Sequence, residues 1–134
     1  MNNYLLPNNS DIEDKVFYWK LKADFYRYKC ECALGQELEE TCAKAEECYL
    51  GAFELSKNGL PIYNTERLGL YLNFSKFYYE WKNKINDAYK TAKEAIEGLN
   101  DVPVSEVNNK DNAEIIEGLK KNLEIWESEM NNNE

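Results

Sequence analysis

Four polar residues near the start of the chain have the types and spacing that anion binding requires. Arg27 supplies a guanidinium fork that can hold two phosphate oxygens, and Tyr28 supplies a phenolic hydroxyl beside it. Lys20 lies seven residues before Arg27, which on a helix is two turns along the same face. Asp24 lies between them at same-face spacing and can hold either cation in place. Taken alone, such residues are more often a solvated charged stripe with a surface arginine and a core tyrosine.

The residues on which most enzymes and metal sites depend are missing from this sequence. It contains no histidine, which is the commonest general base and metal ligand. The cysteines do not have zinc-site spacing, and we expect all four to be reduced core residues: Cys30, Cys32, Cys42 and Cys48. There is no glycine-rich phosphate loop and no serine nucleophile elbow. The sequence therefore predicts a protein that is not an enzyme and that binds no cofactor or metal.

Composition restricts the remaining functions. The chain has 134 residues, which suits one domain over residues 1–134, and an apolar share of 43%, which is too high for a disordered protein. Its 16 basic residues against 25 acidic ones give a net charge of -9, which argues against nucleic-acid binding. No run of about 18–20 apolar residues could cross a membrane, and the N-terminus lacks a secretory-signal pattern. We therefore expect a cytoplasmic protein whose partners are neither nucleic acid nor membrane.

The hydrophobic pattern predicts an all-α fold, an antiparallel array of five amphipathic helices. We expect these helices at about residues 11–34, 37–57, 63–81, 86–99 and 111–130. Asn9, Ser10 and Asp11 offer capping oxygens for the first helix, and Gly35 is expected to end it. The third helix has aromatic residues on most sides and is the expected centre of the bundle. Residues 100–109 form the one long break.

Three segments carry a specific resemblance. Residues 15–28 read KVFYWKLKADFYRY, residues 67–80 read RLGLYLNFSKFYYE, and residues 122–126 read NLEIW. These segments resemble the 14-3-3 family, in which the second has the form RLGLALNFSVFYYE and the third the form NLTLW. The resemblance runs from about Tyr4 to Met130 and corresponds to the last five helices of the nine-helix 14-3-3 subunit. It implies an adaptor that binds phosphoserine or phosphothreonine motifs of client proteins in an amphipathic groove.

The resemblance also assigns roles to individual polar residues. It implies that Arg27 and Tyr28 contact the phosphate. Lys20, on the same helix face as Arg27, is expected to help hold either the phosphate or the acidic end of the peptide. Asn73 and Asn122 would bond to the main chain of the bound peptide, because an amide side chain both donates and accepts hydrogen bonds.

Three further residues would complete the groove. Leu72 would contribute to its apolar wall, and Glu80 lies on the same helix face as Asn73. Glu80 is also the carboxylate that looks most buried, because aromatic residues precede and follow it. Trp126 is expected to line the groove, with its N–H turned toward the peptide or toward Glu80.

The chain departs from the family pattern at positions that normally form the apolar wall. Lys76 stands where the family has valine, and Glu114 and Gly118 stand where it has leucine. Each lost leucine gives up roughly 1.5–3 kcal/mol of possible contact energy. We therefore expect a groove that keeps its phosphate end and has an altered wall, with weak or altered phosphopeptide preference.

Assembly and function leave two alternatives open. The full-length family forms homo- or heterodimers, through N-terminal helices that also carry two further basic residues of the phosphate pocket. The resemblance does not extend to those N-terminal helices or to their two basic residues. We therefore expect this chain to be either a fragment or a truncated relative. The alternative function is a helical protein-interaction scaffold that binds its partners without phosphate.

Overall fold

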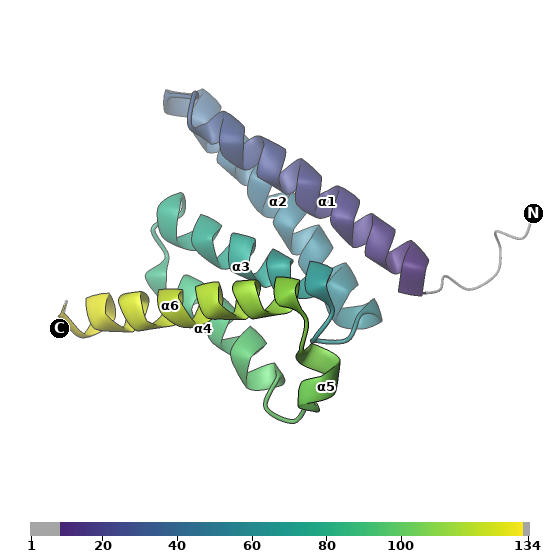
Figure 1. The fold of residues 1–134 in the computed structure, drawn as a ribbon. Coiled ribbons are helices and arrows are strands. Elements are labelled where there is room, and N and C mark those ends of the chain that lie inside the picture. Colours follow the sequence, from purple (N-terminus) through teal and green to yellow (C-terminus); the bar gives the residue numbers. More distant parts are fainter. Residues whose placement is uncertain (1–8, 133–134) are drawn as a thin grey trace, which may run out of the picture.

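The computed structural model describes residues 9–132, which form six α-helices (Figure 1). Their bounds are α1 Asn9–Cys30, α2 Gly35–Gly59, α3 Thr65–Glu80, α4 Ile85–Gly98, α5 Val104–Val107 and α6 Lys110–Asn132. No strand occurs within these residues, so the predicted all-α class is confirmed. Asn9 and Ser10 were expected to cap the first helix, but their side chains are not among those that the structure describes. Tyr4, where the resemblance begins, lies outside the described residues.

The first two helices form an antiparallel pair (Figure 1). Small and apolar residues on their facing sides are buried: Val16, Ala23, Cys30, Cys42, Ala45, Cys48, Tyr49 and Ala52. Cys30 Sγ lies 3.2 Å from Cys42 Sγ in this layer. The expectation of core cysteines is wrong for Cys32, which is exposed, because residues 30 and 32 point to different sides of the chain.

The other three long helices pack against one another. α4 runs antiparallel to α3, to which the short turn at residues 81–84 joins it, and antiparallel to α6, since the Tyr89 hydroxyl near its start donates to Glu127 near the end of α6. As a result, α3 and α6 run in the same direction. Near their first residues the Thr65 hydroxyl donates to Asn112 Oδ1 at 2.7 Å, and near their last residues the Tyr79 hydroxyl donates to Glu129 at 2.6 Å. α1 shares this direction, since its Glu13 accepts from Asn64, at the start of α3.

The predicted central position of α3 is confirmed by its contacts with α1, α2, α4 and α6. Its first turn is capped by Asn64, whose side chain accepts from the Arg67 backbone N–H at 3.0 Å. Phe74 stacks on Tyr49 of α2 with ring centroids 5.2 Å apart and on Tyr78 at 4.6 Å. These rings fix the position of α3 against the α1–α2 pair.

The largest difference from the predicted helix bounds is at the turn between α1 and α2. α1 ends at Cys30 rather than at residue 34, and the backbone N–H groups of Glu31 and Cys32 form turn bonds to carbonyls three residues back. Gly35, with φ of +58°, begins α2 instead of ending α1. No residue in this turn is a helix breaker, so the packing of α1 on α2 determines where α1 ends.

The short helix α5 lies within the break expected at residues 100–109. It follows Pro103, whose ring fixes φ at −58°.

Candidate functional site

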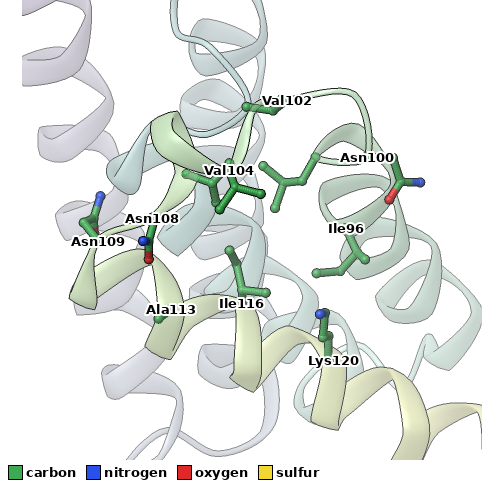
Figure 2. A pocket seen from close by; sticks show the side chains of 11 residues that line it. Ile96, Asn100, Val102, Val104, Asn108, Asn109, Ala113, Ile116 and Lys120 are labelled. Carbon is green, nitrogen blue, oxygen red and sulfur yellow. The ribbon is translucent and has the colours of Figure 1, made fainter.

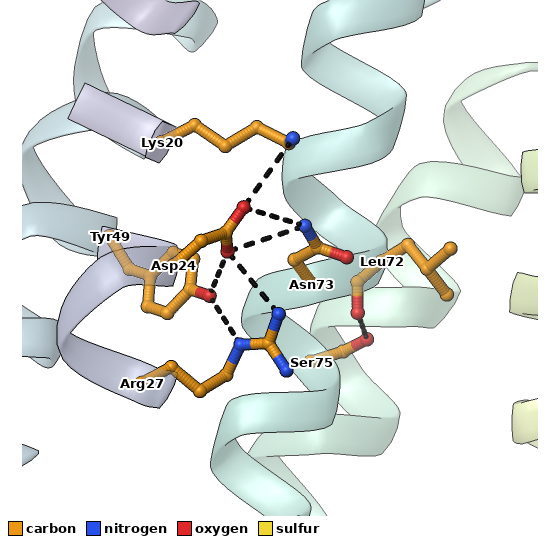
Figure 3. A network of polar contacts seen from close by, with 7 residues as sticks. All are labelled: Lys20, Asp24, Arg27, Tyr49, Leu72, Asn73 and Ser75. Atoms are coloured by element: carbon orange, nitrogen blue, oxygen red, sulfur yellow. Dashed lines mark hydrogen bonds and ion pairs between the residues drawn. The ribbon is translucent and has the colours of Figure 1, made fainter. Parts of the chain in front are cut away.

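A single carboxylate organises a cluster of polar side chains between α1, α2 and α3 (Figure 3). The Tyr49 hydroxyl donates to Asp24 Oδ1 at 2.5 Å and accepts from Arg27 Nε at 3.1 Å. Asn73 Nδ2 lies 3.4 and 3.3 Å from the two carboxylate oxygens. Lys20 Nζ lies 3.7 Å from Asp24 Oδ2, and Arg27 Nη2 lies 3.6 Å from Oδ1. We call these five residues the Asp24 cluster.

Helix geometry and packing explain why these groups meet. Lys20, Asp24 and Arg27 are four and three residues apart and therefore lie on one face of α1. Tyr49 reaches them because Ala45 and Ala52, one turn away on either side, are too small to hold the helices apart. The Arg27 and Lys20 side chains flank Asp24 on the side that faces α3 (Figure 3).

The electrostatics of the cluster favour binding an anion. Two cations share one carboxylate, which leaves one net positive charge, and their side chains are 20% and 13% exposed. Burial alone would lower the Arg27 pKa, but the neighbouring Tyr49 and Asp24 outweigh it, and the pKa is raised. Burial, together with the Asp24 charge, raises the Tyr49 pKa. At neutral pH the cluster therefore holds a charged guanidinium and a neutral phenol.

Tyr28 contacts Arg27 but is far more exposed. The Arg27 guanidinium carbon lies 4.8 Å from the centre of the Tyr28 ring. The tyrosine is 60% exposed, whereas the Arg27 side chain is 13% exposed. The ring also borders a hollow of about 310 Å³ whose other lining residues include Lys29 and Glu37 but no member of the Asp24 cluster. The predicted pair is thus in contact through the ring face.

The three parallel helices share one face of the molecule. A methyl group at Gly69 on α3 would lie 3.6 Å from Lys20 Cε on α1 and 3.8 Å from Ile115 Cδ1 on α6. A methyl group at Gly118 on α6 would lie 3.6 Å from Leu72 Cδ2 on α3. The α1–α3–α6 face is defined by these contacts and by same-face neighbours one turn away: Lys20, Asp24, Arg27, Gly69, Leu72, Asn73, Lys76, Glu114, Gly118 and Asn122.

The three altered wall positions and the second asparagine belong to this face. Lys76 is half-buried one turn after Leu72, and Glu114 is exposed one turn before Gly118. Within residues 9–132 neither charged residue forms an ion pair. Asn122 is half-buried one turn after Gly118.

Trp126 and Glu80 are placed differently from the other candidates. Trp126 is 3% exposed and stacks on Tyr79 with ring centroids 5.4 Å apart, so its ring belongs to the core between α3, α4 and α6. A contact of its N–H with a peptide stays a prediction. Glu80 ends α3 and is exposed, because neighbouring helical residues point about 100° apart and the flanking aromatic residues do not cover it.

The sequence matches the family model described as 14-3-3 protein over residues 1–127. The chain belongs to the 14-3-3 family. The 14-3-3 protein beta/alpha-B of Xenopus laevis is 40% identical over 136 residues, which cover 100% of this chain and 56% of the relative. The 14-3-3 protein beta/alpha of Homo sapiens is 40% identical over 138 residues, covering 100% and 55%. The chain spans just over half the length of these curated relatives.

Sequence reasoning missed the full part that Tyr49 plays in this 14-3-3 chain. The apolar pattern gives Tyr49 only a core position, and its ring is indeed buried. Its hydroxyl nevertheless bridges Asp24 and Arg27. The residue type could have indicated this role, because Tyr49 is a large residue with a hydroxyl group in a stripe that otherwise contains alanine and cysteine.

A second hollow of about 340 Å³ lies between α4, α5 and α6 (Figure 2). Ile96, Val104 and Ile116 point into the same space, and Lys120 lies beside it (Figure 2). Its volume is that of a small-ligand pocket. Its lining is mostly aliphatic with three asparagines and one lysine, so it lacks the guanidinium fork that holds a phosphate group.

Two further findings concern the part of this 14-3-3 chain that the structure describes. None of its helices has the length and apolar character needed to span a bilayer. None of its acidic and cysteine side chains come together in a group of three or more suited to a metal ion.

Proposed function

We propose that this chain is a phosphoserine- or phosphothreonine-binding adaptor, without catalytic activity, that regulates phosphorylated client proteins by binding them. The ligand lies along the α1–α3–α6 face. Arg27 and Lys20 hold the phosphate with the help of Tyr28, and Asn73 and Asn122 bond to the peptide main chain.

The observation that carries this proposal is the Asp24 cluster. Asp24, Tyr49 and Asn73 hold the two cations in place before any ligand arrives. A prearranged guanidinium loses little conformational freedom on binding, and its contact with a phosphate is charge-assisted. The local positive charge stands out in a chain whose net charge is -9.

The four free cysteines are in keeping with a reducing, cytoplasmic environment.

The altered wall limits this function. Leu72 faces Gly118 rather than a second large side chain, so less apolar area is available to a ligand. Lys76 and Glu114 place charges of opposite sign on α3 and α6. We therefore infer that binding is weaker than on an apolar wall and that ligands with polar or charged side chains beside the phosphate are preferred.

Fluorescence anisotropy with one peptide, in phosphoserine and serine forms, tests the proposal. The phosphorylated form should bind and the serine form should not. Arg27→Ala should weaken binding at least 30-fold, because truncating one partner of a charged hydrogen-bonded pair costs about 2–5 kcal/mol. Lys20→Ala should weaken it less, and its longer, partly exposed ion pair makes unfolding a minor concern.

Lys15→Ala is the matched control, because Lys15 is an exposed cation of α1 outside the α1–α3–α6 face. It should leave the affinity within about twofold. Equal binding of the two peptide forms, unaffected by Arg27→Ala, would contradict the proposal and favour the phosphate-independent scaffold. Circular dichroism of each variant establishes that the helices are retained.

A further inference from the structure

The hollow between α4, α5 and α6 shares no lining residue with the Asp24 cluster or with the α1–α3–α6 face. Its volume of about 340 Å³ is near the lower end of the range for small-ligand sites. Ile96 of α4, Val104 of α5 and Ile116 of α6 point into the same space (Figure 2). A concave aliphatic surface of this size suits a small ligand with a hydrocarbon body.

The α5 wall of the hollow presents an exposed apolar side chain on a fixed backbone. Val104 is 77% exposed, and a hydrocarbon ligand in the hollow would remove part of it from water. The backbone N–H of Asn108 donates to the Val104 carbonyl at 2.8 Å. The buried Asn112 side chain donates to the Val107 carbonyl at 3.1 Å, which ties α5 to α6. The wall is therefore formed before a ligand binds.

One charged residue lines the hollow. Lys120 is exposed and lies beside the space between Ile96 and Ile116 (Figure 2). No acidic residue is among the described lining residues, although the net charge of the chain is -9. Glu117 and Glu124 lie one turn before and after Lys120 on α6, yet Lys120 forms no ion pair with any residue that the structure describes. Its ammonium group is therefore available to an anionic group at the edge of the hollow.

We propose that this hollow binds a small aliphatic carboxylate. The hydrocarbon chain of the ligand packs against Ile96, Val104 and Ile116, and its carboxylate pairs with the Lys120 ammonium group. A single lysine is a compact point charge without the bidentate fork of arginine, so it suits one carboxylate better than a phosphate group.

α6 separates this hollow from the residues proposed to bind phosphopeptides. Ile116 and Lys120 each lie two residues from Gly118, and residues two apart on a helix point about 200° apart. Gly118 faces Leu72 on the α1–α3–α6 face. The carboxylate and a phosphopeptide therefore bind on opposite sides of α6, and the carboxylate site does not depend on whether the chain binds phosphopeptides.

Titration of the isotope-labelled 134-residue chain with octanoate, followed by the amide chemical shifts in two-dimensional NMR spectra, tests the proposal. We expect saturable shifts centred on residues 96–120, with a dissociation constant of about 0.1–1 mM for a ligand of so few atoms. The shorter butanoate should bind at least tenfold more weakly, because it buries fewer methylene groups. Shifts that do not saturate, or that centre on the α1–α3–α6 face, would overturn the proposal.

A charge deletion tests the part that Lys120 plays. Lys120→Gln should weaken octanoate binding about threefold, as expected for an exposed ion pair. Octanamide, which has no charge, should bind the parent chain and Lys120→Gln equally. The matched control is Lys121→Gln, because Lys121 is also an exposed cation of α6 but does not line the hollow. Equal effects of the two lysine variants on octanoate binding would contradict the proposal.

A larger side chain inside the hollow tests the location of the site. Ala113 lines the hollow and is exposed, so Ala113→Phe occupies the ligand space without entering the core. It should weaken octanoate binding at least fivefold, because the added ring takes the volume of the ligand. Ser128→Phe, at an exposed position of α6 outside the hollow, should leave the affinity unchanged. Circular dichroism establishes that both variants keep their helices, and unchanged binding by Ala113→Phe would overturn the proposal.

Discussion

Asn73 on α3 donates from Nδ2 to the carboxylate of Asp24 on α1, at 3.3 Å from Oδ2 and 3.4 Å from Oδ1. This bond ties together the two helices that carry the phosphate-binding candidates. The bond holds the amide in a fixed orientation and leaves its carbonyl oxygen free to accept from a ligand. We expect a backbone N–H of a bound peptide to donate to this oxygen.

Removing the charge of Asp24 should destabilise the fold. In Asp24→Asn, Tyr49 and Asn73 lose a charged acceptor, and Lys20 and Arg27 lose the group that separates their charges. We expect the free energy of unfolding to fall by about 2–3 kcal/mol, measured by urea denaturation. Asp14→Asn, on the exposed side of the same helix, should change it by less than about 0.5 kcal/mol. Equal stability of the two variants would contradict a central role for Asp24.

Restoring the apolar wall should raise the affinity for phosphopeptides with apolar side chains beside the phosphate. Gly118→Leu adds a side chain beside Leu72 and Glu114→Leu adds one a turn earlier on the same face, each worth roughly 1.5–3 kcal/mol if fully buried. We expect at least a tenfold lower dissociation constant by anisotropy. Glu117→Leu, an exposed α6 position outside the α1–α3–α6 face, is the control. Tight binding by the parent chain, unchanged in the double variant, would refute the altered-wall hypothesis.

A single methyl group at Gly118 should stabilise the protein. In Gly118→Ala the new Cβ would lie 3.6 Å from Leu72 Cδ2, which is ordinary contact. The free energy of unfolding should rise by about 1 kcal/mol, because alanine favours the helix interior over glycine. Gly59→Ala provides the contrast, since its Cβ would collide with Ile12. Thermal melts should move in opposite directions, and a fall in stability for Gly118→Ala would contradict the packing described here.

The protein should lose stability in alkali. Burial, with a hydrogen bond to Cys42, raises the pKa of Cys30 from 9.0 to about 12, and burial also raises the Tyr49 pKa. Above about pH 9 the unfolded chain releases these protons while the folded chain keeps them. These two groups therefore contribute their whole stabilisation below about pH 9. The free energy of unfolding then falls toward pH 12, by up to about 1.4 kcal/mol per pH unit for each group.

Urea denaturation in reducing buffer at several pH values measures this slope. Cys30→Ala should flatten it, whereas Cys32→Ala, at an exposed thiol, should not. A free energy of unfolding that is constant or rises between pH 8 and pH 11 would show that these buried groups do not control the alkaline response.

How far the sequence predicts the structure depends on whether a feature is local. The position of α3 follows from its aromatic residues, and the common face of Lys20, Asp24 and Arg27 follows from helical spacing alone. The end of α1 does not follow, because contacts with α2 decide it. The same holds for the Tyr49 hydroxyl and the buried ring of Trp126, each of which depends on a neighbouring helix.

The shared direction of α1, α3 and α6 restricts how this chain can change in length. Their contacts stay in register over several turns, from Glu13 with Asn64, through Lys20 beside Gly69, to Asp24 with Asn73. An inserted residue within α3 would rotate everything after it by about 100° and carry Asn73 away from Asp24. Insertions and deletions should therefore be tolerated in the connection around α5 and selected against inside the three aligned helices.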